Sequence, residues 1–252
     1  MKKSILFLSI LLFPVLISGQ ETEKIRQEIR KYYPLPKVDK RVELLSIVFR
    51  LAGNNEYNDE SFKSYVSDIH RHFDRYRDHP LIAYAKELSN KNGVCFDAVQ
   101  AMAIHLEQPP SLNPVIPFSE NVPERRWGKD HALKFVTLLK QFYTDANCEE
   151  FFTEHEEMYE VAVEKLMPVY KALDVDWYRQ YYGIQPEVTL NVMVGLSLGA
   201  GNYGPKVKYP DGREDNFAIL GASSIDTAGN PEFPVENYLP TLIHEFNHSY
   251  VN

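Results

Sequence analysis

Hydrophobic residues recur at helical spacing over the first two thirds of the chain. Apolar positions three and four residues apart predict amphipathic helices over residues 39–52, 59–77, 80–91, 94–106, 129–146 and 149–173. Pro168 lies inside the last of these stretches and should kink or end the helix. Residues 108–128 carry five prolines, which excludes a helix there and predicts a surface loop. Strand signals are absent from this whole region.

The pattern changes near Gly183, where alternation replaces helical spacing. Residues 187–198 alternate and are rich in Val and Leu, and residues 217–223 form a second candidate strand. The segment from Tyr238 to Val251 contains no glycine and follows Asn237, a good N-cap residue, so a final helix is expected. The pattern therefore predicts a mostly helical α+β protein.

Three segments follow from this reading. Residues 1–19 resemble a signal peptide, since two lysines precede an apolar run that is short for a membrane span. Residues 20–183 form the helical region, and residues 184–252 form a portion with a small β-sheet and the last helix. No cysteine follows the apolar run to accept a lipid, so we expect a secreted or periplasmic protein with no stable membrane span after cleavage.

The composition, net charge and cysteine content of the chain limit which partners and which kinds of site are expected. The chain has 252 residues, of which 44% are hydrophobic and 25% charged, as in folded soluble proteins. Its formal net charge of -8 argues against nucleic acid as a partner. Export would permit a disulfide between Cys95 and Cys148, although their spacing does not decide whether one forms. No CxxC pair is present, which removes cysteine-based zinc sites from consideration.

The predicted last helix carries the sequence His244-Glu245-Phe246-Asn247-His248. The two histidines are four residues apart and share one helix face, so both imidazoles can bind a single Zn²⁺. A carboxylate beside them can act as general base toward a zinc-activated water. The pattern therefore predicts a zinc metallopeptidase that hydrolyses a peptide or protein substrate. The opposite helix face is apolar, with Leu239, Leu242, Ile243, Phe246 and Tyr250.

At these residues the chain resembles the zincin metallopeptidases, in particular the gluzincins. The segment HEFNHSYVN resembles an uncharacterised family of secreted bacterial HExxH proteins with a helical N-terminal region. The likeness is specific from Glu187 to Asn252. It implies that His244 and His248 bind zinc and that Glu245 is the general base. It also implies that the strand at residues 217–223 is the edge strand along which an extended peptide lies.

The pattern departs from these families after the second histidine. Val251 occupies the position of a glycine that metzincins require, and gluzincins take a third ligand, a Glu, from a later helix. Catalytic zinc usually has three protein ligands. We therefore expect the third ligand beyond Asn252, in a longer protein of which this chain is a fragment. The alternative is a complete chain whose site is finished by an upstream residue or by water.

Two further residues and one further function class remain open. Asp226 could orient a ligand histidine, or it could be an ordinary turn residue. Tyr203 could donate a hydrogen bond to a tetrahedral oxyanion, or it could be an ordinary loop residue. A non-catalytic zincin-like binding module, or a helical adaptor whose motif is structural, is the alternative to an enzyme.

Overall fold

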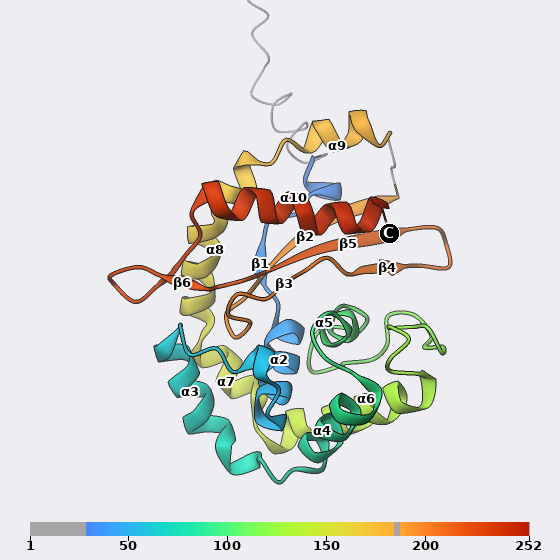
Figure 1. The fold of residues 1–252 in the computed structure, drawn as a ribbon, viewed down its shortest axis with the longest axis vertical. Helices are drawn as coiled ribbons and strands as arrows, with labels where there is room; N and C mark the ends of the chain where they lie inside the picture. Colours follow the sequence, from blue (N-terminus) through green and yellow to red (C-terminus); the bar gives the residue numbers. More distant parts are fainter. Residues whose placement is uncertain (1–28, 184–186, 252) are drawn as a thin grey trace, which may run out of the picture.

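The computed structural model describes residues 29–183 and 187–251, which form a mixed α/β fold with many helices and a small sheet (Figure 1). The prediction of a mostly helical α+β class is confirmed, whereas the predicted signal peptide lies outside the described residues. The α-helices are α2 (Lys40–Ala52), α3 (Lys63–Phe73), α4 (Pro80–Asn92), α5 (Asp97–Ile104), α6 (Lys129–Asp145), α7 (Cys148–Glu154), α8 (Glu156–Ala172), α9 (Val175–Tyr181) and α10 (Val235–Val251). Short 3-10 helices are η1 (Asn55–Tyr57) and η2 (Asp74–Tyr76).

Local signals set the ends of the helices in the first part of the chain. The Asp39 side chain accepts the Arg41 backbone N–H and starts α2, which ends at Gly53 with a φ of 90°. Pro80 occupies the first turn of α4, where its missing N–H costs no helical hydrogen bond, and Gly93 ends that helix with a φ of 71°. Both helices lie within about one residue of the predicted stretches, because the caps and the apolar spacing agree.

The predicted helix over residues 149–173 is instead two helices, α7 and α8, that meet at His155. The His155 backbone N–H donates to the Thr153 carbonyl. The Nδ1 atom of its imidazole donates to the Phe151 carbonyl at 2.7 Å. That carbonyl would pair with the His155 N–H in an unbroken helix, so the side chain ends α7. Pro168 does not end the helix, since α8 continues past it to Ala172.

The sheet combines two long parallel strands with short strands on either side of them. Its strands are β1 (Lys37–Val38), β2 (Val188–Gly195), β3 (Asn202–Tyr203), β4 (Lys206–Lys208) and β5 (Glu214–Gly221); β6 (Ser224–Ile225) and β7 (Pro231–Glu232) form a separate hairpin. β2 and β5 are parallel over eight residue pairs, and β1 adds to the other side of β2. β1 lies in the region that was predicted to lack strands, so that prediction is wrong at this point. The strand was missed because two residues are too few to show an alternating pattern.

The expectation that residues 217–223 form an edge strand is wrong. β5 pairs with β2 on one side, and β3 and β4 pair with it on the other side, antiparallel. β3 and β4 share one register with β5, so residues 202–208 form a single antiparallel segment, which we call the edge segment. Gly204 and Pro205 interrupt this segment, and no alternating pattern marks it in the sequence.

Helices cover both faces of the sheet (Figure 1). α10 lies across one face and contacts β5 and α8, while α2 and α5 lie on the opposite side. On α10, Leu242 and Phe246 are fully buried, as the apolar face of the sequence predicted. One continuous hydrophobic core includes residues from the helices and from the strands. The segment boundary between residues 183 and 184 stays a prediction.

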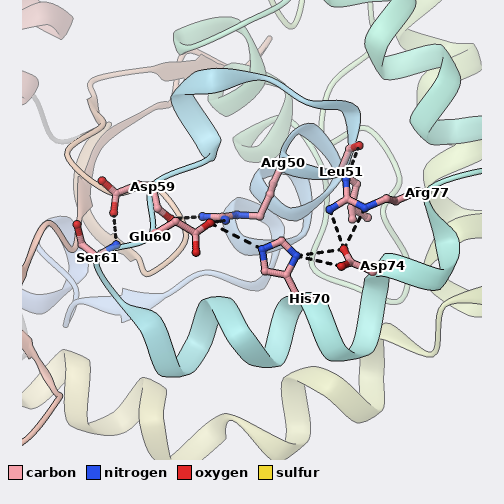
Figure 2. A network of polar contacts seen from close by, with 8 residues as sticks. All are labelled: Arg50, Leu51, Asp59, Glu60, Ser61, His70, Asp74 and Arg77. Atoms are coloured by element: carbon pink, nitrogen blue, oxygen red, sulfur yellow. Dashed lines mark hydrogen bonds and ion pairs between the residues drawn. The ribbon is translucent and has the colours of Figure 1, made fainter.

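A polar network joins the end of α2 to α3 (Figure 2). The buried Arg50 guanidinium donates to the Glu60 carboxylate at 2.9 Å, and Glu60 lies 3.8 Å from the His70 imidazole. The other His70 nitrogen contacts Asp74, which also accepts from Arg77 at 2.7 Å. The network links α2 to α3 within the group of helices α2 to α7, which lie on the side of the sheet away from α10 and which we call the helical layer (Figure 1).

The two cysteines, Trp127 and the lengths of the helices all lie among the described residues. Cys95 is half-buried and Cys148 is buried, and both thiols are free, so no disulfide joins them. Trp127, at the end of the proline-rich loop, is fully buried and donates to the Ala98 carbonyl at 2.8 Å. Among the described helices, none has the length and apolar character needed to cross a membrane.

Candidate metal centre

Helix α10 is held firmly at its first turns. It begins at Val235, two residues before the predicted N-cap Asn237. The Tyr238 hydroxyl donates to the Gly221 carbonyl at 2.9 Å, which ties the start of α10 to the end of β5. Burial of the apolar face against the sheet then turns the opposite side of the helix outward.

The two motif histidines converge on the outer side of α10. The Nε2 atoms of His244 and His248 lie 3.1 Å apart, and their rings meet nearly edge to face at 84°. Two nitrogen ligands at about 2.0–2.1 Å from one tetrahedral zinc ion lie about 3.3–3.4 Å apart. The observed separation is close to that value, so the pair fits a shared zinc ion. His244 is exposed and His248 half-exposed, which leaves the pair open to an ion from solvent.

Glu245 lies beside the histidines but deeper, with only 6% of its surface exposed. Burial raises the pKa of its carboxyl, while the neighbouring His244 and His248 act in the opposite direction. A carboxylate in such a position is a candidate proton acceptor.

The edge segment contacts α10 at this same residue. A Cβ atom on Gly204 would lie 2.2 Å from the Glu245 carbonyl oxygen, so only a glycine allows this approach of the two backbones. Two residues further on, Lys206 donates through Nζ to the Ser249 carbonyl at 2.8 Å, near the end of α10. In the described part of the chain, no strand pairs with the outer side of the edge segment.

Tyr203 and Asp226 lie elsewhere. Gly204 faces α10, and its strand neighbour Tyr203 lies near Tyr57 and Glu56 of the helical layer. Burial, with the nearby Glu56 charge, raises the pKa of Tyr203 to about 12. Asp226 accepts from Lys165 at 2.7 Å and from two backbone N–H groups of its own turn. These hydrogen bonds lower the pKa of Asp226 to about 2. They are the contacts of an ordinary turn residue.

The sequence patterns assigned no role to the aromatic residues that pack along α10, which are Tyr178 of α9 and Tyr182, the residue directly after α9. The Tyr178 hydroxyl donates to the Ile243 carbonyl at 3.3 Å, and the Tyr182 ring stacks on Tyr250 with 4.1 Å between centroids. The Tyr182 hydroxyl also donates to the side chain of Asn247 at 3.4 Å. Asn247 lies between the two histidines in the sequence. Aromatic residues four apart over residues 177–182 share one face of a helix, and this spacing was the sequence signal that could have indicated the contact.

The two histidines are the candidate metal ligands that the motif itself brings together. Among the described residues, no group of three or more His, Cys, Asp or Glu side chains is arranged to hold a metal ion. Asn252 lies outside the described residues, and the third ligand stays a prediction.

Comparison with known proteins gives a family but no activity. Residues 35–252 match the model of a family described as a Domain of unknown function (DUF4932). The chain belongs to this family. No curated protein and no solved structure matches it.

Proposed function

We propose that this DUF4932 protein is a secreted zinc metallopeptidase with a zincin-like arrangement of sheet and HExxH helix. The observation that carries the proposal is the 3.1 Å separation of the His244 and His248 Nε2 atoms, with the Glu245 carboxylate beside them on α10. Two neutral imidazoles and an adjacent buried carboxylate are the residue types that zinc-dependent hydrolysis requires.

His244 and His248 would hold the metal. A bound zinc ion would supply Lewis acidity, polarising a peptide carbonyl and making a water acidic enough to lose a proton near neutral pH. Glu245 would accept that proton and later deliver it to the leaving amine. Its burial favours the protonated form of the carboxyl, which assists the first transfer, from the water to the carboxylate.

The edge segment supports the binding of an extended substrate. Its outer side has no strand partner among the described residues, and Gly204 brings it against Glu245. A peptide that adds to this segment as a further strand would run past the carboxylate, held by backbone hydrogen bonds. The edge-strand role that the family likeness implied thus moves from β5 to residues 202–208.

Zinc content and peptide cleavage test the proposal together. We expect one zinc ion per chain by native mass spectrometry and turnover of members of a mixed peptide library. Glu245→Gln should keep the zinc and lower kcat by about 10²–10⁴-fold, the usual contribution of a general base. His244→Ala and His248→Ala should lose zinc and activity together.

Asp226→Asn is the matched control, because Asp226 contacts Lys165 and its own turn. It should keep both zinc and activity. Full peptidase activity in Glu245→Gln would remove Glu245 as the base. Bound zinc without turnover of any peptide would favour the non-catalytic binding module, and a folded chain that binds no zinc would favour the helical adaptor.

Export is the remaining part of the proposal, and its support is the lysine pair and apolar run at the start of the sequence. The mature chain recovered from the secreting cell should begin near residue 20. N-terminal sequencing of that chain would show retention of Met1 if the segment is not a cleaved signal.

A further inference from the structure

An open cleft of about 610 Å³ lies in the helical layer. Helices α2, α4 and α5 contribute to its lining, and they lie on the other side of the sheet from α10 (Figure 1). The cleft is bounded by the end of α2, by η1, by α4 and by the start of α5. Its volume falls within the range of about 300–1,000 Å³ that is usual for small-molecule sites. The residues that matter to its chemistry are Asn54, Asn55, Glu56, Ser89, Asn90 and Phe96.

Phe96 presents an aromatic ring at this cleft from a strained backbone. Its φ of 50° and ψ of −120° are rarely adopted by a residue with a side chain. Neighbouring side chains hold it there: its N–H donates to the Glu56 carboxylate at 3.3 Å, and its carbonyl accepts from the Tyr57 hydroxyl at 3.1 Å. The side chain is 52% exposed, in contrast to the buried phenylalanines of the described core. Strain that the surroundings maintain in this way is concentrated at ligand sites.

The polar side of the cleft is ordered before any ligand binds. Asn54, only 9% exposed, donates through Nδ2 to Glu56 at 3.0 Å and to Ser89 at 2.9 Å. Asn55 and Asn90 add exposed carboxamides at the rim. Carboxamides both donate and accept hydrogen bonds, and so they suit a ligand that carries hydroxyl groups.

The charges of the lining further restrict the ligand. Glu56 is the carboxylate and Lys86 the ammonium among the lining residues, so the cleft has no excess of positive charge. An anionic ligand such as a phosphate would meet Glu56 without a cationic cluster to offset it. A purely apolar ligand would leave the carboxamides and the carboxylate without water or hydrogen-bond partners.

We propose that this cleft binds a neutral pyranose sugar. The C–H face of the sugar packs on the Phe96 ring, and its hydroxyl groups hydrogen-bond with Asn55, Asn90 and Glu56. The site is separate from α10, so it goes beyond the proposed peptidase function and does not depend on it. It would direct the protein to a glycan-bearing surface or substrate.

Saturation-transfer NMR and calorimetry on the full chain test this site. The probes are the methyl pyranosides of glucose, galactose, mannose and N-acetylglucosamine, together with their β-linked disaccharides. We expect saturable binding of at least one of these sugars. Phe96→Gly should weaken that binding at least tenfold without lowering Tm, because glycine adopts a positive φ freely. Asn90→Ala, at an exposed position of α4, should also weaken it.

Tyr181→Ala is the matched control, since Tyr181 is an exposed aromatic residue on α9 and does not line the cleft. It should bind the sugar as the wild type does. Absence of saturable binding across the whole panel would overturn the proposal. Equal affinity in wild type, Phe96→Gly and Asn90→Ala would do the same, as would loss of binding only in Tyr181→Ala.

Discussion

Gly204 lies so close to the backbone of Glu245 that a Cβ atom at position 204 would sit 2.2 Å from the Glu245 carbonyl oxygen. This contact joins the edge segment directly to the motif helix. The position of the candidate general base relative to a strand-like substrate therefore depends on a single missing side chain.

Gly204→Ala should displace α10 from the edge segment. The added methyl group meets backbone rather than a flexible side chain, so neither element can yield locally. We expect the free energy of unfolding to fall by about 1–3 kcal/mol, measured by urea denaturation. Peptidase activity should fall by more than stability alone explains, because the carboxylate moves relative to the substrate.

Gly212→Ala separates this steric effect from the general cost of replacing a glycine. Gly212 has a φ of 92°, and no atom lies within 4 Å of the position of its added Cβ. The substitution should cost about 1 kcal/mol through backbone strain and leave activity unchanged. Equal loss of activity in both variants would show that the Gly204 contact has no special role.

The motif helix and the edge segment differ in how far the sequence reveals them. The pairing of His244 with His248 can be predicted from the sequence, because spacing along one helix determines which side chains share a face. The edge segment depends on pairing with β5, a non-local contact, and it spans Gly204 and Pro205 with no alternation to mark it. The sequence therefore predicted that His244 and His248 share one face of the helix, but it assigned the edge of the sheet to the wrong strand.

Helix boundaries show the same limit. The ends of α2 and α4 follow from caps and glycines that act within a few residues. The break at His155 arises because its imidazole hydrogen-bonds to the Phe151 carbonyl. The other ring nitrogen of His155 also contacts the Asp68 carboxylate on α3 at 3.1 Å. A tertiary contact of this kind leaves no periodic signal, whereas Pro168 gives a strong local signal that packing overrides.

Zinc should stabilise the folded protein through the histidine pair. A ligand that binds only the native state at 100 times its Kd adds about 2.7 kcal/mol to the free energy of unfolding. Titration of the metal-free chain with zinc should therefore raise Tm, and a chelator should reverse the change. His248→Ala should abolish this response, while Asp226→Asn should keep it. A zinc-dependent rise of equal size in His248→Ala would place the ion elsewhere.

Asp39 is a buried anchor of the helical layer. Burial alone would raise the pKa of its carboxyl, but attraction to Arg41 and the hydrogen bonds from its guanidinium hold the pKa well below the usual range. Asp39→Asn leaves the buried Arg41 guanidinium without its carboxylate, so we expect a loss of about 3 kcal/mol in urea denaturation at pH 7.

The loss should depend on pH in a definite direction. A carboxyl with a lowered native pKa stabilises the fold above its ordinary value near 3.8 and loses this effect as the pH falls through the native pKa. The difference between wild type and Asp39→Asn should therefore narrow in strong acid. Asp211→Asn, in an exposed pair with Arg213, should change stability little at any pH. A large effect there would contradict the role given to burial.

Glu43 on α2 is a buried carboxyl of the opposite kind. It accepts from the Leu196 N–H at 2.5 Å and from the Ser197 hydroxyl at 2.8 Å, so it ties α2 to the loop after β2. Burial raises its pKa from an ordinary value near 4.5 to about 7, although these hydrogen bonds act in the opposite direction. The native state therefore binds a proton that the unfolded chain has already released over this pH range.

Glu43 should consequently make the protein less stable as the pH rises from about 4.5 to about 7. Glu43→Gln keeps a neutral side chain of the same shape and removes this contribution. We expect it to match the wild type near pH 4.5 and to exceed its free energy of unfolding at pH 8 by up to about 3 kcal/mol. Urea denaturation across this pH range measures the difference, with the exposed Glu164→Gln as control. Parallel curves for wild type and Glu43→Gln would mean that Glu43 does not titrate in this range.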